Sequence, residues 1–585
     1  MKKSVLVIFS EDLSEKNKIK WGQFNTLVAP ERFEVIAKKY DLVFKNINEF
    51  VDTGSIYEAS TFAEELSLQI LPDGSRISKV FMYKGYELWW MHYNSLFLYF
   101  CLPYTQYKKL LEYIRNFHSV YLYQPPYKSL FSCYLQAYEC EFNLIRKKGV
   151  RSPAILPFGV FLQIILTLIS IPFLMINKCH LMIFIGDKFD KSKDYDFRMK
   201  FIYEELRRRG LPFIEFIRSL EPWRNVLQHV FVRRRPVVYS EGVAFVGRFI
   251  SIVTGGHRKG KQKFGTHTFV SQTDPDVRFK LLVATQYLIS GYDDVWAIRI
   301  MKLILRMIGV RAVYITAVLE RNFHAFLGCK LLNIPVIGIQ HGAAPKDYFV
   351  SDFMCKFDGE KQLSVDKYGL WSEWWKEYYI KNSKAYSKDQ LFVSGPMRPQ
   401  KHRDVLIARR LQKKNSSIKV LFVPGQISAP KEVMPYLLAL METEGVSVYL
   451  TFRPYRDAFE KKLRESNPGI IEKFGKEKIL RGSIQDAISE CDIVVGSNST
   501  AVLEALLQLK PLVFFDTKKW GDYFEMKSFE SSYKFFAENP AELVKYIKEN
   551  VDMSEDVLKK LQEKFFGDPY KNGSEWVVDQ LKSVP

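Results

Sequence analysis

The chain has 585 residues, 47% of them hydrophobic, which excludes a largely disordered protein and leaves room for about three globular domains. Its net charge of +20 favours a polyanionic neighbour: nucleic acid, an anionic membrane surface or a negatively charged substrate. The seven cysteines are odd in number and include no CxxC pair, which argues against a disulfide framework and a zinc site and suits a reducing cytosol.

Residues 1–150 are predicted to form an α/β domain. Residues 4–9 form an apolar run that we interpret as a first strand, because acidic residues follow it and no signal-peptide cleavage site appears. Apolar runs at 42–44 and 120–123 and a helical stretch at 108–117 continue the pattern. No phosphate loop, metal cluster or nucleophile motif occurs here, so the sequence assigns this domain no role.

An apolar segment follows at 151–178. Residues 152–177 carry no charge, and about 20 apolar residues suffice to cross a bilayer. Three prolines are expected to confine the uninterrupted helix to residues 158–171, and basic residues flank both ends. These features predict a re-entrant or interfacial membrane helix, with a buried core helix as the alternative.

Residues 179–400 alternate between apolar and helical patterns, as a parallel sheet with crossover helices does. The expected elements are strands at 180–187 and 212–217, a helix at 196–209, and an apolar run at 236–240 that leads into Glu241. The basic run at 257–263 is expected to be a loop that could rest on anionic lipid head groups. Asp293 and Asp294 are interpreted as a helix N-cap in preference to a metal pair.

The most informative motif of this region is Gln340-His341-Gly342. It follows an expected strand at 334–339, and a strand at 311–316 and a helix at 317–332 precede it. Ligands of open α/β sheets gather where parallel strands end, and Gly342 lets a substrate approach the backbone closely. On spacing alone, His341 could equally serve only to hydrogen-bond a loop.

Residues 401–585 predict a second Rossmann-like unit. An expected strand at 418–424 ends at Gly425, and another at 446–453 ends at Arg453, with Tyr455 shortly after. A final helix at 576–581 is expected to return to the first unit.

Within this second unit, a strand at 492–496 leads into Ser497, Asn498, Ser499 and Thr500, before an expected helix at 501–509 and a strand at 511–516. Hydroxyls and free N–H groups at a helix start attract anions, although the same four residues also suit an ordinary N-cap.

The QHG loop at 340–342 and the stretch SNSTAVLEALLQLKPLVFFD at 497–516 resemble GT-B glycosyltransferases of bacterial surface-polysaccharide synthesis. The similarity is to the group near polysialyltransferases and CDP-glycerol glycerophosphotransferases, and it covers residues 179–580. It implies two Rossmann-like domains: an acceptor side at 179–400 and a nucleotide-donor side at 401–585. It also implies a metal-independent transfer that uses a nucleotide-sugar as substrate and no cofactor.

The resemblance also implies roles for individual residues. Ser497, Ser499 and Thr500 match the family's motif for the donor phosphate. Arg453 falls where these enzymes often carry a His-Pro pair; the histidine is missing, but guanidinium still pairs well with phosphate. His341 matches the family's His-Gly loop and would act as general base, since imidazole titrates at about pH 6.5. Glu320 is the alternative base and His324 a weaker one. The full set comprises catalytic His341 and Glu320, donor-side Gly425, Arg453, Tyr455, Ser497, Asn498, Ser499, Thr500 and Glu504, and acceptor-side Gln340, Gly342 and Glu241.

The function predicted from these observations is a glycosyltransferase at the cytoplasmic face of the cell membrane, acting on a surface polysaccharide or a lipid-linked glycan. Its expected partners are the nucleotide-sugar, the acceptor and the membrane surface. Nucleic acid is not expected, because the basic residues do not gather with aromatic residues in a recognisable module. Two alternatives stay open: a sugar-nucleotide 2-epimerase, and a non-catalytic scaffold of a glycan-assembly complex.

Overall fold

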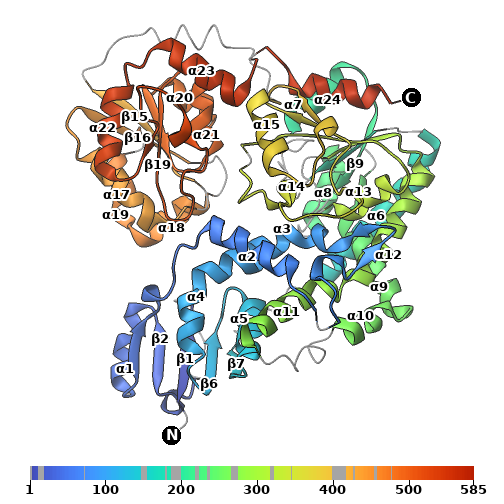
Figure 1. The fold of residues 1–585 in the computed structure, drawn as a ribbon, viewed down its shortest axis with the longest axis horizontal. Coiled ribbons are helices and arrows are strands. Elements are labelled where there is room, and N and C mark those ends of the chain that lie inside the picture. Colours follow the sequence, from blue (N-terminus) through green and yellow to red (C-terminus); the bar gives the residue numbers. More distant parts are fainter. Residues whose placement is uncertain are drawn as a thin grey trace.

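The computed structural model describes residues 3–10, 19–71, 73–145, 155–177, 181–185, 199–217, 223–233, 237–264, 274–315, 322–343, 345–397, 417–425, 428–452, 457–475, 477–568 and 570–584. Three parallel β-sheets with helices packed around them organise this part of the chain (Figure 1). A small antiparallel pair, β4 (Met82–Tyr83) and β5 (Tyr86–Glu87), stands apart from them. The prediction of an α/β protein built on parallel sheets is confirmed.

The first sheet belongs to the N-terminal part of the chain, which lies at the bottom of Figure 1. Its strands run in the order β3-β2-β1-β6-β7, and its central strands are buried and apolar, as expected for a parallel sheet covered by helices. The strands are β1 (Ser4–Ile8), β2 (Thr26–Ala29), β3 (Val43–Asn46), β6 (Ser119–Tyr123) and β7 (Glu141–Ile145). The helices are α1 (Glu34–Lys39), α2 (Ile56–Leu68), α3 (Tyr93–Leu96), α4 (Leu102–Ile114) and α5 (Lys128–Ala137).

The second sheet has seven strands in the order β10-β9-β8-β11-β12-β13-β14. They are β8 (Leu181–Ile185), β9 (Phe213–Ile217), β10 (Val237–Tyr239), β11 (Ala312–Ile315), β12 (Val336–Ile339), β13 (Lys367–Leu370) and β14 (Leu391–Val393). The helices of this unit are α6 (Ile155–Asn177), α7 (Lys200–Arg208), α8 (Trp223–Arg233), α9 (Ser240–Val253), α10 (Gly256–Phe264), α11 (Pro275–Leu288), α12 (Gly291–Ile308), α13 (Phe323–Lys330), α14 (Val350–Phe353) and α15 (Glu373–Asn382).

The third sheet has six strands in the order β17-β16-β15-β18-β19-β20. They are β15 (Ile418–Val423), β16 (Val446–Thr451), β17 (Ile479–Leu480), β18 (Ile493–Gly496), β19 (Leu512–Phe515) and β20 (Phe536–Ala537). The helices are α17 (Pro430–Met441), α18 (Ala458–Ser466), α19 (Pro468–Phe474), α20 (Ile484–Ser489), α21 (Thr500–Leu503), α22 (Pro540–Asn550), α23 (Glu555–Phe566) and α24 (Gly573–Lys582).

The chain's last helix, α24, leaves the third unit and lies against the second sheet (Figure 1). The ring of Trp576 packs on Phe392 of β14 with 5.9 Å between ring centroids, and Asp579 forms an ion pair with Arg209 beyond α7. The N-terminal unit also touches both of the others. Its α5 packs along α11 of the second unit, and the turn before α2 reaches the third unit, where the amide of Ile56 donates to the carbonyl of Lys519. The three units therefore share interfaces.

The apolar segment forms one continuous helix, α6, that packs beside the edge strand β10 and the helix α9. The hydroxyl of Thr167 accepts a hydrogen bond from the amide of Tyr239 at 3.1 Å, and that of Ser170 accepts one from Val237 at 3.4 Å. Residues 158–177 are long and apolar enough to cross a membrane. The prediction that prolines confine the helix to residues 158–171 is wrong: Pro157 lies in the first turn, where no amide is needed, and the helix continues through Pro172.

Two further expectations for the second unit are corrected. The basic run at 257–263 lies in helix α10, which packs against α9, α12 and α11. Gly260 permits a close approach there, because a Cβ at this residue would lie 2.5 Å from the carbonyl of Ile289. Asp293 and Asp294 do not cap their helix, since α12 begins two residues earlier with Ser290 as N-cap. They contact histidines instead, Asp293 at 3.2 Å from His257 and Asp294 at 2.8 Å from His92.

Candidate functional site

The Gln340-His341-Gly342 loop follows β12, a buried strand between β11 and β13. Gln340 is fully buried and is held by β13: its amide donates to the carbonyl of Gly369 at 2.8 Å, and its side-chain oxygen accepts from the amide of Trp371 at 3.1 Å. The indole of Trp371 donates back to the carbonyl of Gln340 at 2.9 Å. Gln340 therefore anchors the loop to the sheet, while the side chain of His341 is exposed.

The loop after β12 meets the start of α21 in the third unit. The amide of Ala343 donates to the hydroxyl of Thr500 at 3.3 Å. A Cβ on Gly342 would come within 3.5 Å of the same hydroxyl oxygen, so the backbone at Gly342 also lies near Thr500. Two motifs that lie far apart in the sequence and belong to different sheets are thus in contact.

A second group of polar side chains gathers beside Thr500, where β15 and β18 end. The hydroxyl of Ser428 lies 3.3 Å from that of Ser497 and donates to the side-chain oxygen of Asn498 at 3.3 Å, while Ser497 donates to the same oxygen at 3.0 Å. Both serines are almost completely buried. Gly425 is required beside them, because a Cβ there would lie 2.0 Å from that oxygen of Asn498.

The helix expected at 501–509 is interrupted in the structure. Ser499 caps α21, accepting from the amide of Ala501 at 3.3 Å, but α21 spans only four residues before a 3₁₀ segment at Glu504–Gln508. Because a helix dipole builds up with length, so short a helix contributes little to binding an anion. The carboxylate of Glu504 accepts from the side chain of Gln485 of α20 at 2.8 Å, which fixes it against the third unit.

Two predicted residues that the structure describes, Glu241 and His324, do not join this contact. Glu320, Arg453 and Tyr455 lie outside the described residues. Glu241 opens α9 after the edge strand β10. Four strand-to-strand steps separate β10 from β12, about 19 Å at the usual spacing, so Glu241 is remote from the QHG loop. His324 is 8% exposed within α13, and its ring lies 4.1 Å from that of Phe323.

One loop that the sequence analysis did not select borders the same edge. It follows β19 and contains Thr517, Lys519 and Trp520, all at least nine-tenths buried. The ring of Trp520 lies 5.3 Å from that of Tyr348, which follows the QHG loop, and Tyr348 lies 6.2 Å from Phe97 of the N-terminal unit. Two consecutive lysines, Lys518 and Lys519, follow the apolar strand after two residues and were the available signal.

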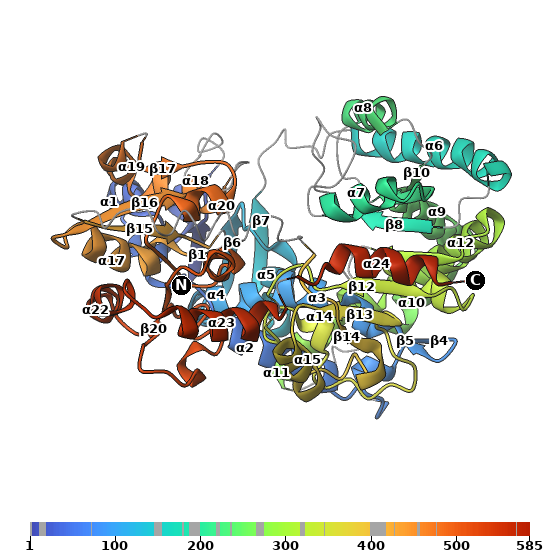
Figure 2. The same cartoon turned by 90° about the horizontal axis from the view of Figure 1, so that it is seen from above.

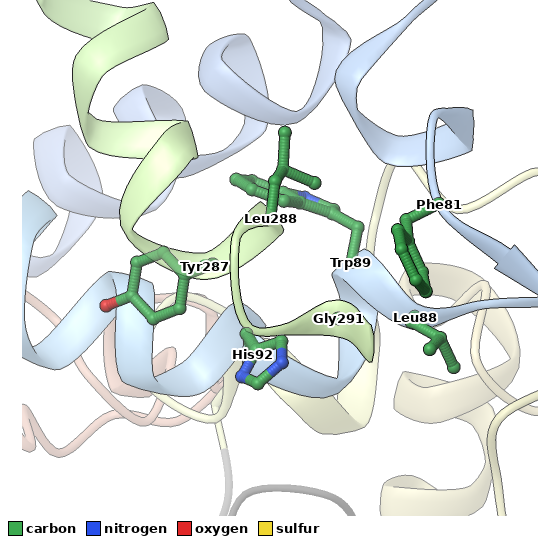
Figure 3. Close-up of a pocket in the computed structure, with 7 residues that line it drawn as sticks. All are labelled: Phe81, Leu88, Trp89, His92, Tyr287, Leu288 and Gly291. Atoms are coloured by element: carbon green, nitrogen blue, oxygen red, sulfur yellow. The ribbon is translucent and has the colours of Figure 1, made fainter. Parts of the chain in front are cut away.

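No metal cluster marks another site in the described part of the chain. No group of three His, Cys, Asp or Glu residues there could hold a metal ion. A small pocket between the N-terminal unit and the helices α11 and α12 is lined by Phe81, Leu88, Trp89, His92, Tyr287, Leu288 and Gly291 (Figure 3). Its volume is about 10 Å³, roughly that of one water, so it is a packing gap and not a substrate site.

No protein-family model matches the chain, and no curated protein matches its sequence. Solved structures similar to it include a glycosyltransferase from Rickettsia africae (11% identity, TM-score 0.39, covering 70% of this chain and 99% of the other). MurG from Acinetobacter baumannii (13%, 0.39, 69% and 99%) and the UDP-GlcNAc 2-epimerase from Methanocaldococcus jannaschii (11%, 0.38, 69% and 99%) are similar to the same degree. At these identities and scores, the activity has to be argued from the chain's own residues.

Proposed function

We propose that this protein transfers a sugar from a nucleotide-sugar donor to a surface polysaccharide or lipid-linked glycan at the cytoplasmic face of the cell membrane. The contact between Ala343 and Thr500, at 3.3 Å, carries the proposal. It joins a loop with an exposed histidine, from one parallel sheet, to a cluster of hydroxyl groups at the edge of another. A transferase needs this arrangement, because an acceptor and a donor must meet in one place.

In this reaction the acceptor oxygen bonds to the anomeric carbon of the sugar while the bond from that carbon to the phosphate oxygen breaks. His341, whose side chain is exposed, takes the proton from the acceptor hydroxyl. The nucleotide leaves with the bonding electron pair. We assign the hydrogen bonds to its phosphate to the hydroxyl groups of Ser497, Ser499 and Thr500, which follow β18 and begin α21.

The membrane part of the proposal is supported by the outer face of α6 and its neighbour α9. The buried side chains of α6 form one stripe against the protein, through Gln163, Thr167, Ile171 and Leu174. Large apolar side chains cover its outer face: Phe158, Phe161, Ile165, Leu168, Ile169, Phe173, Met175 and Ile176; α9 adds Phe245, Phe249, Ile252 and Val253. Because α6 is hydrogen-bonded to β10 along its side, an interfacial position fits better than a crossing.

The location of these helices also suits a membrane surface. α6, α8, α9 and α12 gather at the end of the second sheet remote from the third sheet (Figure 2). The exposed cations Arg258, Lys259, Lys261 and Lys263 of α10 follow α9 directly. Each basic residue near an anionic surface contributes about 1 kcal/mol.

A nucleotide-binding experiment tests the proposal. UDP, CMP, CDP, GDP and their sugar conjugates are added to the purified protein in lipid or detergent, and the melting temperature is measured, since a ligand of the folded state raises it. We expect a shift with one base. His341→Ala should keep that shift and lose transfer to a glycan acceptor by a factor of about 100 or more.

The same assay separates the alternatives. Conversion of a nucleotide-sugar to its epimer without any acceptor, followed by NMR, would establish the epimerase instead. If no nucleotide shifted the melting temperature, the non-catalytic scaffold of a glycan-assembly complex would be the remaining alternative.

A further inference from the structure

Lys519 is a buried cation that has no carboxylate partner in the described part of the chain. Its side chain is 6% exposed, and the contact shown for its ammonium group is with the face of Trp520, 5.7 Å from the ring centroid. The neighbouring Lys518, by contrast, is exposed and forms an ion pair with Asp52. Removing a cation from water without an ion pair costs several kcal/mol, so a residue such as Lys519 is seldom kept for stability.

The charges around Lys519 do not neutralise it. Burial and the positive charge of Lys462 lower the pKa of Lys519 to about 8, while Glu432 raises it. Glu432 is the nearby carboxylate, but one of its oxygens accepts a hydrogen bond from Thr53 of the N-terminal unit at 2.5 Å, and the other is buried without a hydrogen bond. The arrangement leaves a positive potential at this point of the sheet edge.

This position lies beside the donor-side cluster. The strand order β15-β18-β19 places the loops after these three strands next to one another at the carboxyl edge of the sheet. The first two loops supply Ser428 and Ser497, and the third supplies Lys519. Thr517, in the same loop as Lys519, has a buried hydroxyl for which the structure shows no hydrogen-bond partner. Two unpartnered buried donor groups in one loop indicate a ligand rich in acceptor oxygens.

We propose that Lys519, in the loop after β19 and beside the hydroxyl cluster of Ser428 and Ser497, binds the phosphate groups of the nucleotide donor. The inference rests on the proposed function for the identity of the donor, whereas the anion site itself does not depend on sugar transfer. The positive charge of Lys519 then stabilises the negative charge of the phosphate groups in the bound donor. It also stabilises the charge that develops on the nucleotide as the nucleotide leaves the sugar.

The test compares four full-length proteins, the wild type, Lys519→Met, Lys519→Arg and Lys518→Met, in binding inorganic pyrophosphate by calorimetry and thermal shift. The methionine keeps the length of the side chain without its charge, and Lys518→Met is the matched control at the exposed neighbour. We expect Lys519→Met to bind pyrophosphate at least about tenfold more weakly and to melt at the same or a higher temperature without ligand. Lys519→Arg and Lys518→Met should stay within about threefold of the wild type.

The inference is overturned if the wild type does not bind pyrophosphate, or if Lys519→Met binds it as tightly as the wild type does. If Lys519→Met does not fold, Lys519→Arg decides the question. Binding of pyrophosphate by folded Lys519→Arg that is more than about threefold weaker than binding by Lys518→Met would also overturn the inference. Binding that depends on Lys519 without any sugar transfer would keep the anion site and refute the proposed function. Sugar transfer at the wild-type rate by Lys519→Met would keep the proposed function and refute the role of Lys519 in binding the phosphate groups.

Discussion

At the scale of the residue, Gly425 shows how closely the polar cluster of Ser428, Ser497 and Asn498 is packed. A Cβ at this position would lie 2.0 Å from the side-chain oxygen of Asn498 and 2.7 Å from the hydroxyl of Ser428. Gly425→Ala must therefore displace Asn498 and break its hydrogen bonds to Ser428 and Ser497. We expect a loss of about 1–3 kcal/mol in the free energy of unfolding, measured in urea, and weaker nucleotide binding.

The matched control for this change is Gly469→Ala, because nothing lies within 4 Å of a Cβ there and the residue is in the first turn of α19. It should leave stability equal or slightly higher. If Gly425→Ala behaved like the control, the packing of the cluster would have no functional weight.

Asp352 allows a second residue-scale prediction, based on pH. Burial raises the pKa of Asp352 to about 7, while the hydroxyl of Tyr379 donates to its carboxylate. An acid with a raised pKa in the folded state keeps a proton that the unfolded chain releases, so the folded protein loses stability as pH rises from about 4 to about 7. Asp352→Asn removes this loss and should stabilise the protein by roughly 1–3 kcal/mol at pH 8.

Urea unfolding at pH 8 and pH 5 tests the sign, since the advantage of the variant should shrink at the lower pH. Asp389→Asn, at an exposed carboxylate, is the control and should show no such trend. An equal effect of Asp352→Asn at both pH values would contradict the assignment.

At the scale of the element, the strands were predictable and several helices were not. The sequence near β12, β18 and β19 predicts buried strands, because their apolar runs are bounded by turn residues. Helix α10 contains two glycines and four cations, so local propensity argues against it, and its packing against α9, α12 and α11 is not visible in the sequence. Likewise, the 3₁₀ segment after α21 ends at Leu509 with a φ of +50°, which no periodicity of apolar residues reveals.

The outward face of α6 and α9 gives a prediction at this scale. Leu168 and Phe249 are 61% and 59% exposed, and their burial in lipid should contribute about 1.5–3 kcal/mol each. The double variant Leu168→Ser/Phe249→Ser should bind vesicles of mixed neutral and anionic lipid at least about tenfold more weakly in a flotation assay, with an unchanged melting temperature.

Val35→Ser is the control, because Val35 is 75% exposed on α1 in the N-terminal unit, far along the chain from α6. It should float like the wild type. Equal binding by all three proteins would mean that another surface contacts the membrane. Binding that does not depend on anionic lipid would mean that the cations of α10 do not contribute to it.

At the scale of the whole molecule, the contacts between units bring the residues of the candidate site together, and the sequence alone does not predict these contacts. Thr53 and Glu432 are 379 residues apart, and neither belongs to a recognisable motif. Ala343 and Thr500, in contrast, belong to motifs that the sequence did indicate, although only the structure brings them into contact. Motifs at strand ends can be recognised in the sequence because their residues are consecutive. A contact with a residue of another unit cannot be recognised in this way.

The N-terminal unit, to which the sequence assigns no role, contacts the surroundings of Lys519 through Thr53. Its hydroxyl donates to one oxygen of Glu432, the carboxylate whose charge raises the pKa of Lys519. Thr53→Val removes the donor, and Glu432 is then free to turn toward Lys519. We expect a loss of about 1 kcal/mol in the free energy of unfolding and a severalfold weaker affinity for pyrophosphate, since the anion must displace the new ion pair.

Lys431→Met is the matched control on the same side of the interface, because Lys431 is exposed and donates only to the backbone carbonyl of Val51. Lys431→Met should change neither the free energy of unfolding nor the affinity for pyrophosphate by much. The double variant Thr53→Val/Glu432→Gln separates the two effects: neutralising Glu432 should restore pyrophosphate binding without restoring stability. If the affinity stayed low in the double variant, the N-terminal unit would influence the anion site through the position of its backbone and not through the charge of Glu432.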